Sequence, residues 1–230
     1  EERGLYKKMK IGEQAVYLAQ LKGLSKSVAI ERVKTWFVRF GMESWWNKKV
    51  EDLSKGMGQK LQFVTTVLHE PRLVILDEPF SGLDPVNSNL IKDEIYELSR
   101  KGCSIIFSTH RMEQVEEICD HIILVNKGKK ILDGGVAQVK QQFKENLFRI
   151  EFDEMPANST PEAFQIIGHK GNALVVKINE GSRPNDVLNH YLRQNVSIHG
   201  FNEILPSLND IFIKLVEGTS ISRQFQSVNA

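Results

Sequence analysis

The sequence predicts an α/β protein, with a helical layer first, a largely parallel sheet next and a small α+β unit last. Three observations predict this fold class. Apolar residues recur at helical spacing between residues 11 and 50. Continuous apolar strands then alternate with amphipathic helices up to about residue 143, which is typical of parallel strands covered on both faces. Beyond residue 145 the strands alternate apolar and polar residues, as half-exposed antiparallel strands do.

Two helices make up the helical subdomain that we expect at about residues 11–50. The first is marked by Val16, Leu18 and Leu21 and ends at Gly23. The second begins after Ser25, a good N-cap residue, and carries four apolar residues at helical spacing: Ile30, Val33, Phe37 and Phe40. Trp45 and Trp46 follow in a connector, and we expect them to pack this layer on its neighbour.

Helices and buried strands alternate from about residue 61 to about residue 143. The pattern predicts strands at residues 73–76, 104–107 and 121–125. It predicts helices that carry Leu61, Val64 and Leu68, then Ile91, Ile95 and Leu98, then residues 112–119. Residues 126–129 read as a hairpin turn that leads into Ile131 and Leu132.

A change of texture near residue 145 predicts a domain boundary. Residues 1–145 would form the first domain, 146–217 an α+β accessory domain and 218–230 a tail. In the accessory domain we expect strands at 148–152, 173–178 and 197–201, and helices at 185–193 and 208–216. Its histidines, His169, His190 and His199, fit no metal-ligand spacing. We expect a dimerising or regulatory role for it, with ligand sensing as the alternative.

Composition excludes several classes of protein. With 30 Lys and Arg against 29 Asp and Glu, the chain has no global field that would recruit nucleic acid or anionic lipid. No apolar run approaches the roughly 18 residues that a membrane-spanning helix needs.

Cys103 and Cys119 lie in apolar surroundings and match no metal-binding spacing, so we expect free thiols. Since the sequence begins at Glu1 and not at a methionine, we expect a portion of a longer protein.

Two acidic residues, Asp77 and Glu78, end the first apolar strand. Ligands of open parallel sheets bind outside this carboxyl edge. Because side chains alternate along a strand, the two carboxylates face different ways and can hold different roles. Asp77 is placed to hold Mg²⁺, and Glu78 to orient and deprotonate a water that attacks a terminal phosphate. Taken alone, the pair more often only ends a strand in solvent, so its neighbours decide the interpretation.

The first neighbour is the glycine-containing segment of residues 53–60, which opens a helix. Unpaired N–H groups and the positive end of the helix dipole make such a helix start a phosphate site. Ser54 adds a hydroxyl, and Gly56 and Gly58 allow the backbone to approach a ligand closely.

Two more neighbours lie at the same predicted edge. In the segment 81–84, Gly82 permits a tight turn, and Asp84 followed by Pro85 is a good helix start. His110 comes just past the next buried strand and leaves the sheet at the same edge as Glu78. Each signal is modest alone, but their order and spacing together are specific.

At this point the sequence resembles the nucleotide-binding domain of ABC transporters, over residues 1 to about 143. Residues 53–59 resemble the family's signature loop, 73–78 its Walker B strand, 81–84 its D-loop and His110 its switch histidine. The resemblance implies a partial P-loop NTPase fold with a helical subdomain. Residues 206–213 and the unit before them resemble the small accessory domain of ABC-2 type exporters of the sodium- and drug-efflux branch.

The family pattern implies roles for these residues. Glu78 would be the general base, His110 would touch the γ-phosphate of ATP, and Asp77 would serve Mg²⁺. Ser54 and Gly56 would contact the γ-phosphate of ATP held by the opposite subunit. The other implied ATP-binding residues are Lys55, Met57, Gly58, Gln59 and Asp84. Asp84 would also help couple the two sites of a dimer.

The resemblance also implies partners and a location. The cofactors would be ATP and Mg²⁺, and the partners a second ATPase subunit, identical or different, and an integral membrane permease. Nucleic acid is not expected as a partner. The protein would sit peripherally on the cytoplasmic face of a bacterial cell membrane and power export. The transported substrate is selected by the permease and is not written in this chain.

Two departures from the family pattern stand out. Lys55 and Met57 replace the glycine and glutamine of the commonest signature form; Lys55 either adds a cation near the phosphates or is a solvated lysine. No Gly-x-x-x-x-Gly-Lys-[Ser/Thr] segment occurs in the sequence, although this loop cradles the phosphates in the family. We therefore expect the chain to be a C-terminal portion that is not competent for catalysis alone, with part of its sheet uncovered.

Two alternatives belong to other classes of protein. A soluble ABC-type ATPase of translation or DNA metabolism would bring tandem cassettes, coiled-coil insertions or basic tails, and the sequence contains none. A non-catalytic regulatory relative would keep the fold and lose the chemistry, but Glu78 and His110 are both present.

Overall fold

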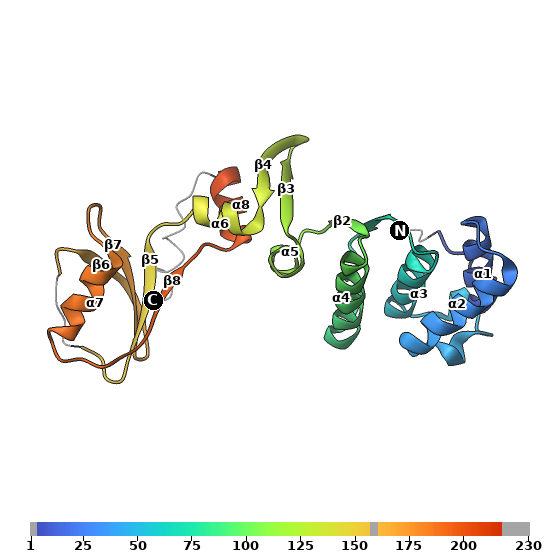
Figure 1. The fold of residues 1–230 in the computed structure, drawn as a ribbon, viewed down its shortest axis with the longest axis horizontal. Helices are drawn as coiled ribbons and strands as arrows, with labels where there is room; N and C mark the ends of the chain where they lie inside the picture. The colour runs from blue at the N-terminus through green and yellow to red at the C-terminus, as the bar shows by residue number, and fades with distance from the viewer. Residues whose placement is uncertain (1–3, 157–160, 218–230) are drawn as a thin grey trace. The chain divides into compact units, whose positions relative to one another are not determined.

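The computed structural model describes residues 4–156 and 161–217 and divides into two compact units, residues 1–110 and 111–230. In the first unit (Figure 1), the elements are α1 (Ile11–Leu21), α2 (Lys26–Arg39), the short 3₁₀ helices η1 (Glu43–Trp45) and η2 (Val50–Asp52), α3 (Lys55–Val67), β1 (Leu73–Asp77), α4 (Pro85–Arg100) and β2 (Ser104–Ser108). Every helix and strand predicted for this region is present.

Helices α1 and α2 form the predicted helical layer. The Ser25 hydroxyl accepts the backbone N–H of Val28, which confirms this residue as the N-cap of α2. Trp46 packs edge to face against Phe37 of α2, with ring centroids 5.7 Å apart. Its ring also lies directly against Gly12 of α1. Trp46 therefore packs within the helical layer, between α1 and α2, and not on the neighbouring layer as predicted.

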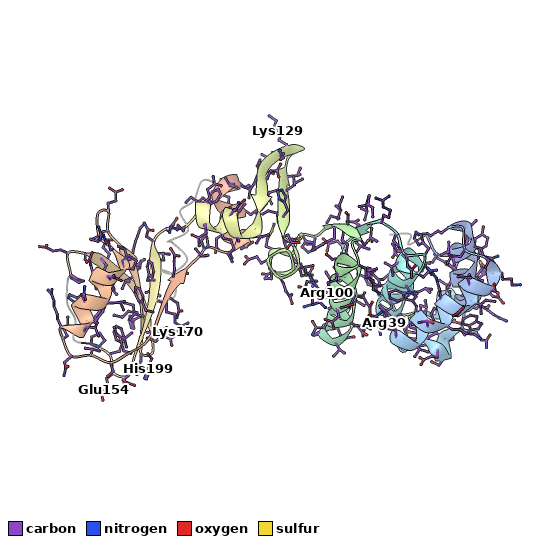
Figure 2. The ribbon with its side chains drawn as sticks, viewed as in Figure 1. Arg39, Arg100, Lys129, Glu154, Lys170 and His199 are labelled. Carbon is purple, nitrogen blue, oxygen red and sulfur yellow. The ribbon has the colours of Figure 1, made fainter. Side chains whose placement is uncertain are left out.

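An ion pair and a ring cluster link α2 to the elements after it. Phe40, the C-cap residue of α2, stacks on Phe63 of α3, with ring centroids 5.8 Å apart. Arg39, labelled in Figure 2, pairs with Glu94 of α4, whose side chain is only 3% exposed. Burial raises the pKa of Glu94, and the charge of Arg39 opposes that shift. The helical layer is thus joined to the helix that follows β1.

Strands β1 and β2 pair in parallel, from Leu73 opposite Ser104 to Asp77 opposite Ser108. Both strands therefore end at the same edge, as predicted. The expectation of strands covered on both faces is wrong for this pair. Val74 and Leu76 of β1 are buried, but the neighbouring Ile75 and Ile106 are 68% and 57% exposed. One face is open, as the expectation of an uncovered part of the sheet requires.

The second unit begins with α5 (Met112–Ile118), the hairpin β3 (His121–Asn126) and β4 (Lys129–Gly135), and α6 (Val136–Gln142). Lys127 and Gly128 at the hairpin turn both have positive φ, which fits the predicted two-residue turn. The helix α8 (Leu208–Glu217) packs on this part of the unit. Leu208 and Ile211 of α8 are buried with Val139 of α6, against apolar side chains of α5, β3 and β4.

The rest of the second unit is an antiparallel sheet with one helix. Its elements are β5 (Leu147–Phe152), β6 (Phe164–Lys170), β7 (Ala173–Ile178), α7 (Pro184–Leu192) and β8 (Ile198–Ile204), and the strand order is β6-β7-β5-β8. Val187 and Tyr191 of α7 are buried against the strands. The strand β6 was not predicted, because the bulge between Ile166 and Gly168 breaks the alternation that marks a strand.

The predicted boundary near residue 145 and the observed units do not fall at the same place. The units divide after His110, and α8 packs on elements that precede residue 145. The boundary at 145 marks the change of sheet and stays a prediction as a domain limit. Cys103 and Cys119 are free thiols, as predicted. Within residues 4–156 and 161–217, no helix combines the length and the apolar character needed to cross a bilayer.

Candidate functional site

The backbone turns sharply where β1 ends. Glu78 has a φ of 45°, a left-handed conformation that is uncommon for a residue with a side chain. Its N–H donates to the carbonyl of Ser108 at 2.9 Å, and its own carbonyl accepts the N–H of Ser81 at 3.0 Å. Because backbone hydrogen bonds to Ser108 and Ser81 hold both peptide groups of this residue, the strained conformation persists.

The carboxylate of Glu78 lies against the residues that follow β2. Its Oε1 accepts the backbone N–H of His110 at 3.0 Å and lies 2.6 Å from His110 Nδ1. Its Oε2 accepts the hydroxyl of Thr109 at 3.2 Å. The two predicted catalytic residues are therefore in direct contact. The imidazole of His110 remains 80% exposed, whereas the side chain of Glu78 is 33% exposed.

Two opposing effects set the pKa of Glu78. Burial raises the pKa, but the hydrogen bonds from His110 and Thr109 stabilise the charged form more strongly. The resulting pKa lies below the ordinary 4.5, so Glu78 is ionised at neutral pH.

Asp77 lies on the exposed strand end beside Glu78. Its Oδ1 accepts the hydroxyl of Ser108, its partner across the parallel pair, at 2.5 Å. In the part of the chain that the structure describes, no three acidic, histidine or cysteine side chains gather as a metal cage. A single exposed carboxylate nevertheless fits Mg²⁺, which keeps several waters and takes one or two protein oxygens together with substrate phosphates.

The glycine-containing segment opens α3. Ser54 is the N-cap of this helix, and its hydroxyl accepts the N–H of Met57 at 3.2 Å. A Cβ on Gly56 would lie 3.1 Å from the carbonyl of Gly82, so the helix start and the segment 81–84 touch through glycine backbone. The stem of Lys55 lies over Gly82, whose φ is 76°.

Gln59 ties the same helix to the end of β1. Its side-chain amide donates to the carbonyl of Pro79 at 3.0 Å. The predicted ATP-binding segment and the predicted catalytic strand end are therefore linked within one unit. Gly58 is buried in the helix.

Asp84 caps α4. Its Oδ1 accepts the backbone N–H of Asn87 at 3.0 Å, and Pro85 occupies the first turn, as predicted. The bonds from Asn87 lower the pKa of Asp84. Capping alone accounts for these contacts, so any role toward a nucleotide stays a prediction.

Ser108 and Thr109 are the site residues that the sequence interpretation missed. Each holds one of the two carboxylates, Ser108 that of Asp77 and Thr109 that of Glu78. A signal was available, because two hydroxyl residues stand directly before His110 at the end of the neighbouring strand.

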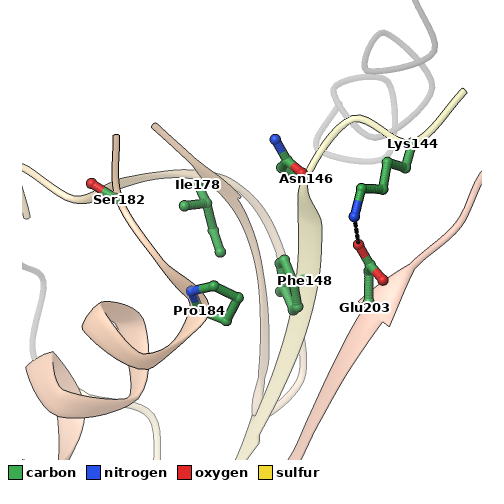
Figure 3. Close-up of a pocket in the computed structure, with 7 residues that line it drawn as sticks. All are labelled: Lys144, Asn146, Phe148, Ile178, Ser182, Pro184 and Glu203. Carbon is green, nitrogen blue, oxygen red and sulfur yellow. Dashed lines mark hydrogen bonds and ion pairs between the residues drawn. The ribbon is translucent and has the colours of Figure 1, made fainter. Parts of the chain in front are cut away.

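A pocket in the second unit lies apart from these residues along the chain (Figure 3). Phe148, Ile178 and Pro184 are among its lining residues, and the ion pair of Lys144 with Glu203, 3.2 Å long, forms one wall. Asn146 and Ser182 complete the lining shown. The pocket contains none of the predicted site residues.

Two protein-family models match the chain. One, described as the C-terminal domain of ATP-binding protein DrrA1-3-like proteins, matches residues 134–216. The other, described as an AAA domain, putative AbiEii toxin of a type IV TA system, matches residues 27–114. The first lies over the predicted accessory domain, and the second over much of the predicted ATPase region.

The similar individual proteins all have names or titles that place them in ABC transporters. YhaQ of Bacillus subtilis, named an uncharacterized ABC transporter ATP-binding protein, is 44% identical over 218 residues, which are 94% of this chain and 72% of that protein. The solved structure of an ATP binding subunit of an ABC transporter matches with a TM-score of 0.57 and 32% identity, over 60% of this chain and 58% of that one. CbiO1 of Clostridium perfringens, part of the ABC transporter complex cbiONQ, matches with a TM-score of 0.51 and 27% identity, over 60% and 55% of the two chains.

Proposed function

This chain belongs to the family of ABC transporter ATP-binding proteins, and from that membership we propose that it carries the ATP-hydrolysing half of such a subunit's catalytic site. The observation that carries the proposal is the contact of Glu78 with His110 at the carboxyl edge of a parallel strand pair. The comparisons do not favour a soluble ATPase of translation or DNA metabolism.

Glu78 acts on the attacking water. Its ionised carboxylate is held by hydrogen bonds from His110 and Thr109. The carboxylate can therefore orient one water toward a terminal phosphate. A carboxylate with a lowered pKa is a weak base. Its main contribution is therefore to fix the direction of attack, and it takes the proton as the phosphoryl group transfers.

His110 and Asp77 complete the proposed catalytic edge. The exposed imidazole of His110 would contact the γ-phosphate while its Nδ1 stays with Glu78. Asp77, oriented by the hydroxyl of Ser108, would hold Mg²⁺. When bound, the ion neutralises charge on the phosphate oxygens.

The start of α3 is the second part of the proposed site. The dipole of this helix favours anions at its start, and Ser54 and Gly56 allow close approach, while Gly58 lies buried within the helix. With Lys55, Met57, Gln59 and Asp84, these residues would contact ATP held by a second subunit. Because the loop Gly-x-x-x-x-Gly-Lys-[Ser/Thr] does not occur in the 230 residues, the β- and γ-phosphates need a cradle that this sequence does not supply.

In the cell, the intact protein would dimerise on binding Mg-ATP and drive an integral membrane permease. Its location would be peripheral, on the cytoplasmic face of a bacterial membrane, and the transport direction would be export. These partners follow from the family and from relatives such as CbiO1, which is part of a transporter complex.

Replacing the proposed general base tests this function. In the full-length protein that contains this chain, Glu78→Gln keeps the size of the side chain but removes the charge that orients water. We expect ATP turnover to fall by about a hundredfold or more, while nucleotide binding is retained. Steady-state phosphate release and equilibrium nucleotide binding measure the two effects.

Asp93→Asn is the matched control, because Asp93 is an exposed carboxylate on α4 outside the proposed site. Its turnover should equal that of the wild type. Unchanged turnover in the Glu78→Gln protein would overturn the assignment of the general base.

A further inference from the structure

The antiparallel sheet of the second unit has one face packed against α7, and that face ends in the pocket of Figure 3. Val187 and Tyr191 of α7 are buried against apolar side chains of β5, β6 and β7. The pocket lies where β5 begins and β7 ends, beside the first residue of α7. Its volume is about 370 Å³, which lies within the range of about 300–1,000 Å³ that small-molecule sites occupy.

A charged residue lies on this face where the alternation of the strand predicts an apolar one. Glu203 of β8 pairs with Phe148 of β5 across the antiparallel ladder, so both side chains lie on the same face of the sheet. Phe201, two residues earlier on β8, shares that face and stacks on Phe148, with ring centroids 5.0 Å apart. A carboxylate in an apolar row opposes folding, and residues that break a local pattern in this way are expected at functional sites.

The carboxylate of Glu203 is paired with the ammonium of Lys144, whose Nζ lies 3.2 Å from Oε1. The side chains of Lys144 and Glu203 are 43% and 29% exposed, and exposed pairs contribute about 1 kcal/mol or less to stability. A ligand that brings both an anion and a cation can therefore replace this pairing with little loss of stability. The wall thus presents one positive and one negative group side by side.

The rest of the lining combines apolar surface with two neutral polar groups. Phe148 and Ile178, which are 8% and 7% exposed, supply apolar surface together with Pro184. Asn146 and Ser182 add an amide and a hydroxyl. The backbone of Asn146 has a φ of 55°, and its carbonyl accepts the N–H of Ile178 at 3.0 Å, which fixes this part of the lining to β7. The pocket therefore suits a small molecule with an apolar body and charged groups at one end.

From this arrangement we propose that the pocket binds a free α-amino acid with an apolar side chain. The carboxylate and the ammonium of an α-amino acid are attached to the same carbon, so one molecule can pair with Lys144 and Glu203 while these two stay close together. Its side chain then covers the apolar surface of Phe148, Ile178 and Pro184. The site lies wholly within the second unit and does not depend on the proposed ATPase function.

Calorimetric titration of L-leucine and of L-phenylalanine into the full-length protein that contains this chain tests the proposal. Three further probes separate the contributions of the two charges. Isocaproate and isopentylamine have the leucine skeleton with only its carboxylate or only its amine, and δ-aminovalerate holds its two charges far apart. We expect at least one of the two amino acids to bind about tenfold more tightly than each of these probes, because each probe leaves a protein charge without its partner.

Substitutions in the wall and in the lining locate the bound amino acid. Glu203→Gln and Lys144→Met each remove one charge but keep the approximate length of the side chain, and each should weaken binding by about tenfold or more. Ser182→Trp keeps both charges and fills the pocket, so it should abolish binding. Because Ser182 lies in the segment before α7 and outside the strands, this variant tests the site without altering the ion pair.

Glu151→Gln is the matched control. Glu151 pairs with Arg149 at 2.9 Å, and both alternate along β5 with Phe148 and Ile150, so this ion pair lies on the opposite face of the same sheet. The control should keep the affinity of the wild type. Thermal unfolding of every variant verifies that a loss of binding is not a loss of the folded state.

Three results would overturn the proposal. The first is that neither amino acid binds to the wild type. The second is that isocaproate or isopentylamine binds as tightly as leucine and phenylalanine, because the pocket would then recognise a single charge. The third is that the affinity is unchanged in folded Glu203→Gln, Lys144→Met and Ser182→Trp proteins, because the amino acid would then bind elsewhere.

Discussion

At the scale of the residue, the site is defined by what holds two adjacent carboxylates. The sequence predicted that Asp77, Glu78 and His110 share one edge, because parallel strands end on the same side of a sheet. It did not predict the left-handed backbone of Glu78 or the hydroxyls of Ser108 and Thr109 as its supports. Those features depend on the register of the two strands, which side-chain patterns do not determine.

The hydrogen bonds on Glu78 predict a pH dependence of stability. The pKa of Glu78 is lower in the folded chain than the ordinary 4.5 of the unfolded chain. The ionised carboxylate therefore stabilises the folded chain at pH values above 4.5, and this stabilisation is lost as the pH falls through the lower pKa of the folded state. Glu78→Gln should therefore lower the free energy of unfolding at neutral pH, by less than about 1 kcal/mol since the side chain is partly exposed. The difference from wild type should shrink below about pH 4.

Chemical denaturation of the 230-residue chain and its Glu78→Gln variant, repeated from neutral to acid pH, measures this difference. A gap between the two proteins that stays constant or widens toward acid pH would contradict the hydrogen-bonding scheme of the carboxylate.

At the scale of the element, the helical layer depends on one glycine. The sequence predicted that the two tryptophans pack the helical layer on its neighbour, since aromatic residues in such connectors are usually part of a core. It could not predict that the ring of Trp46 lies against Gly12, because the contact joins positions that are far apart in the sequence. A Cβ at Gly12 would lie 2.4 Å from the Trp46 ring, too close for any real contact.

The contact between Gly12 and Trp46 predicts that Gly12→Ala changes stability in opposite directions in the presence and in the absence of the Trp46 ring. Gly12→Ala should destabilise the wild-type chain, because overpacking costs about 1–3 kcal/mol and exceeds the roughly 1 kcal/mol that alanine gains over glycine in a helix. In a Trp46→Ala background the ring is absent, so the same substitution should stabilise. Free energies of unfolding for the four chains measure both effects, with Gln20→Ala on exposed α1 surface as the control. The same effect of Gly12→Ala in both backgrounds would contradict the packing.

At the scale of the whole molecule, the sequence predicted the order of the parts better than their limits. The α/β region, the antiparallel accessory sheet and its helix are all present. The position of α8 against α5 and α6 was not predicted, because an amphipathic helix does not reveal in its sequence which surface its apolar side meets. The open face of β1 and β2 was expected from the missing phosphate-binding loop and not from the strands, whose apolar runs predicted cover on both faces.

The central claim is that this chain holds the hydrolytic residues of an ATP site but not the loop that cradles the phosphates. A calorimetric titration of Mg-ATP into the 230-residue chain tests this claim most directly, with the full-length protein as the reference. We predict weak binding, with a Kd above about 1 mM, because the helix start of α3 and one carboxylate edge supply only part of the phosphate contacts. Submicromolar binding of ATP by the 230 residues alone would contradict the claim.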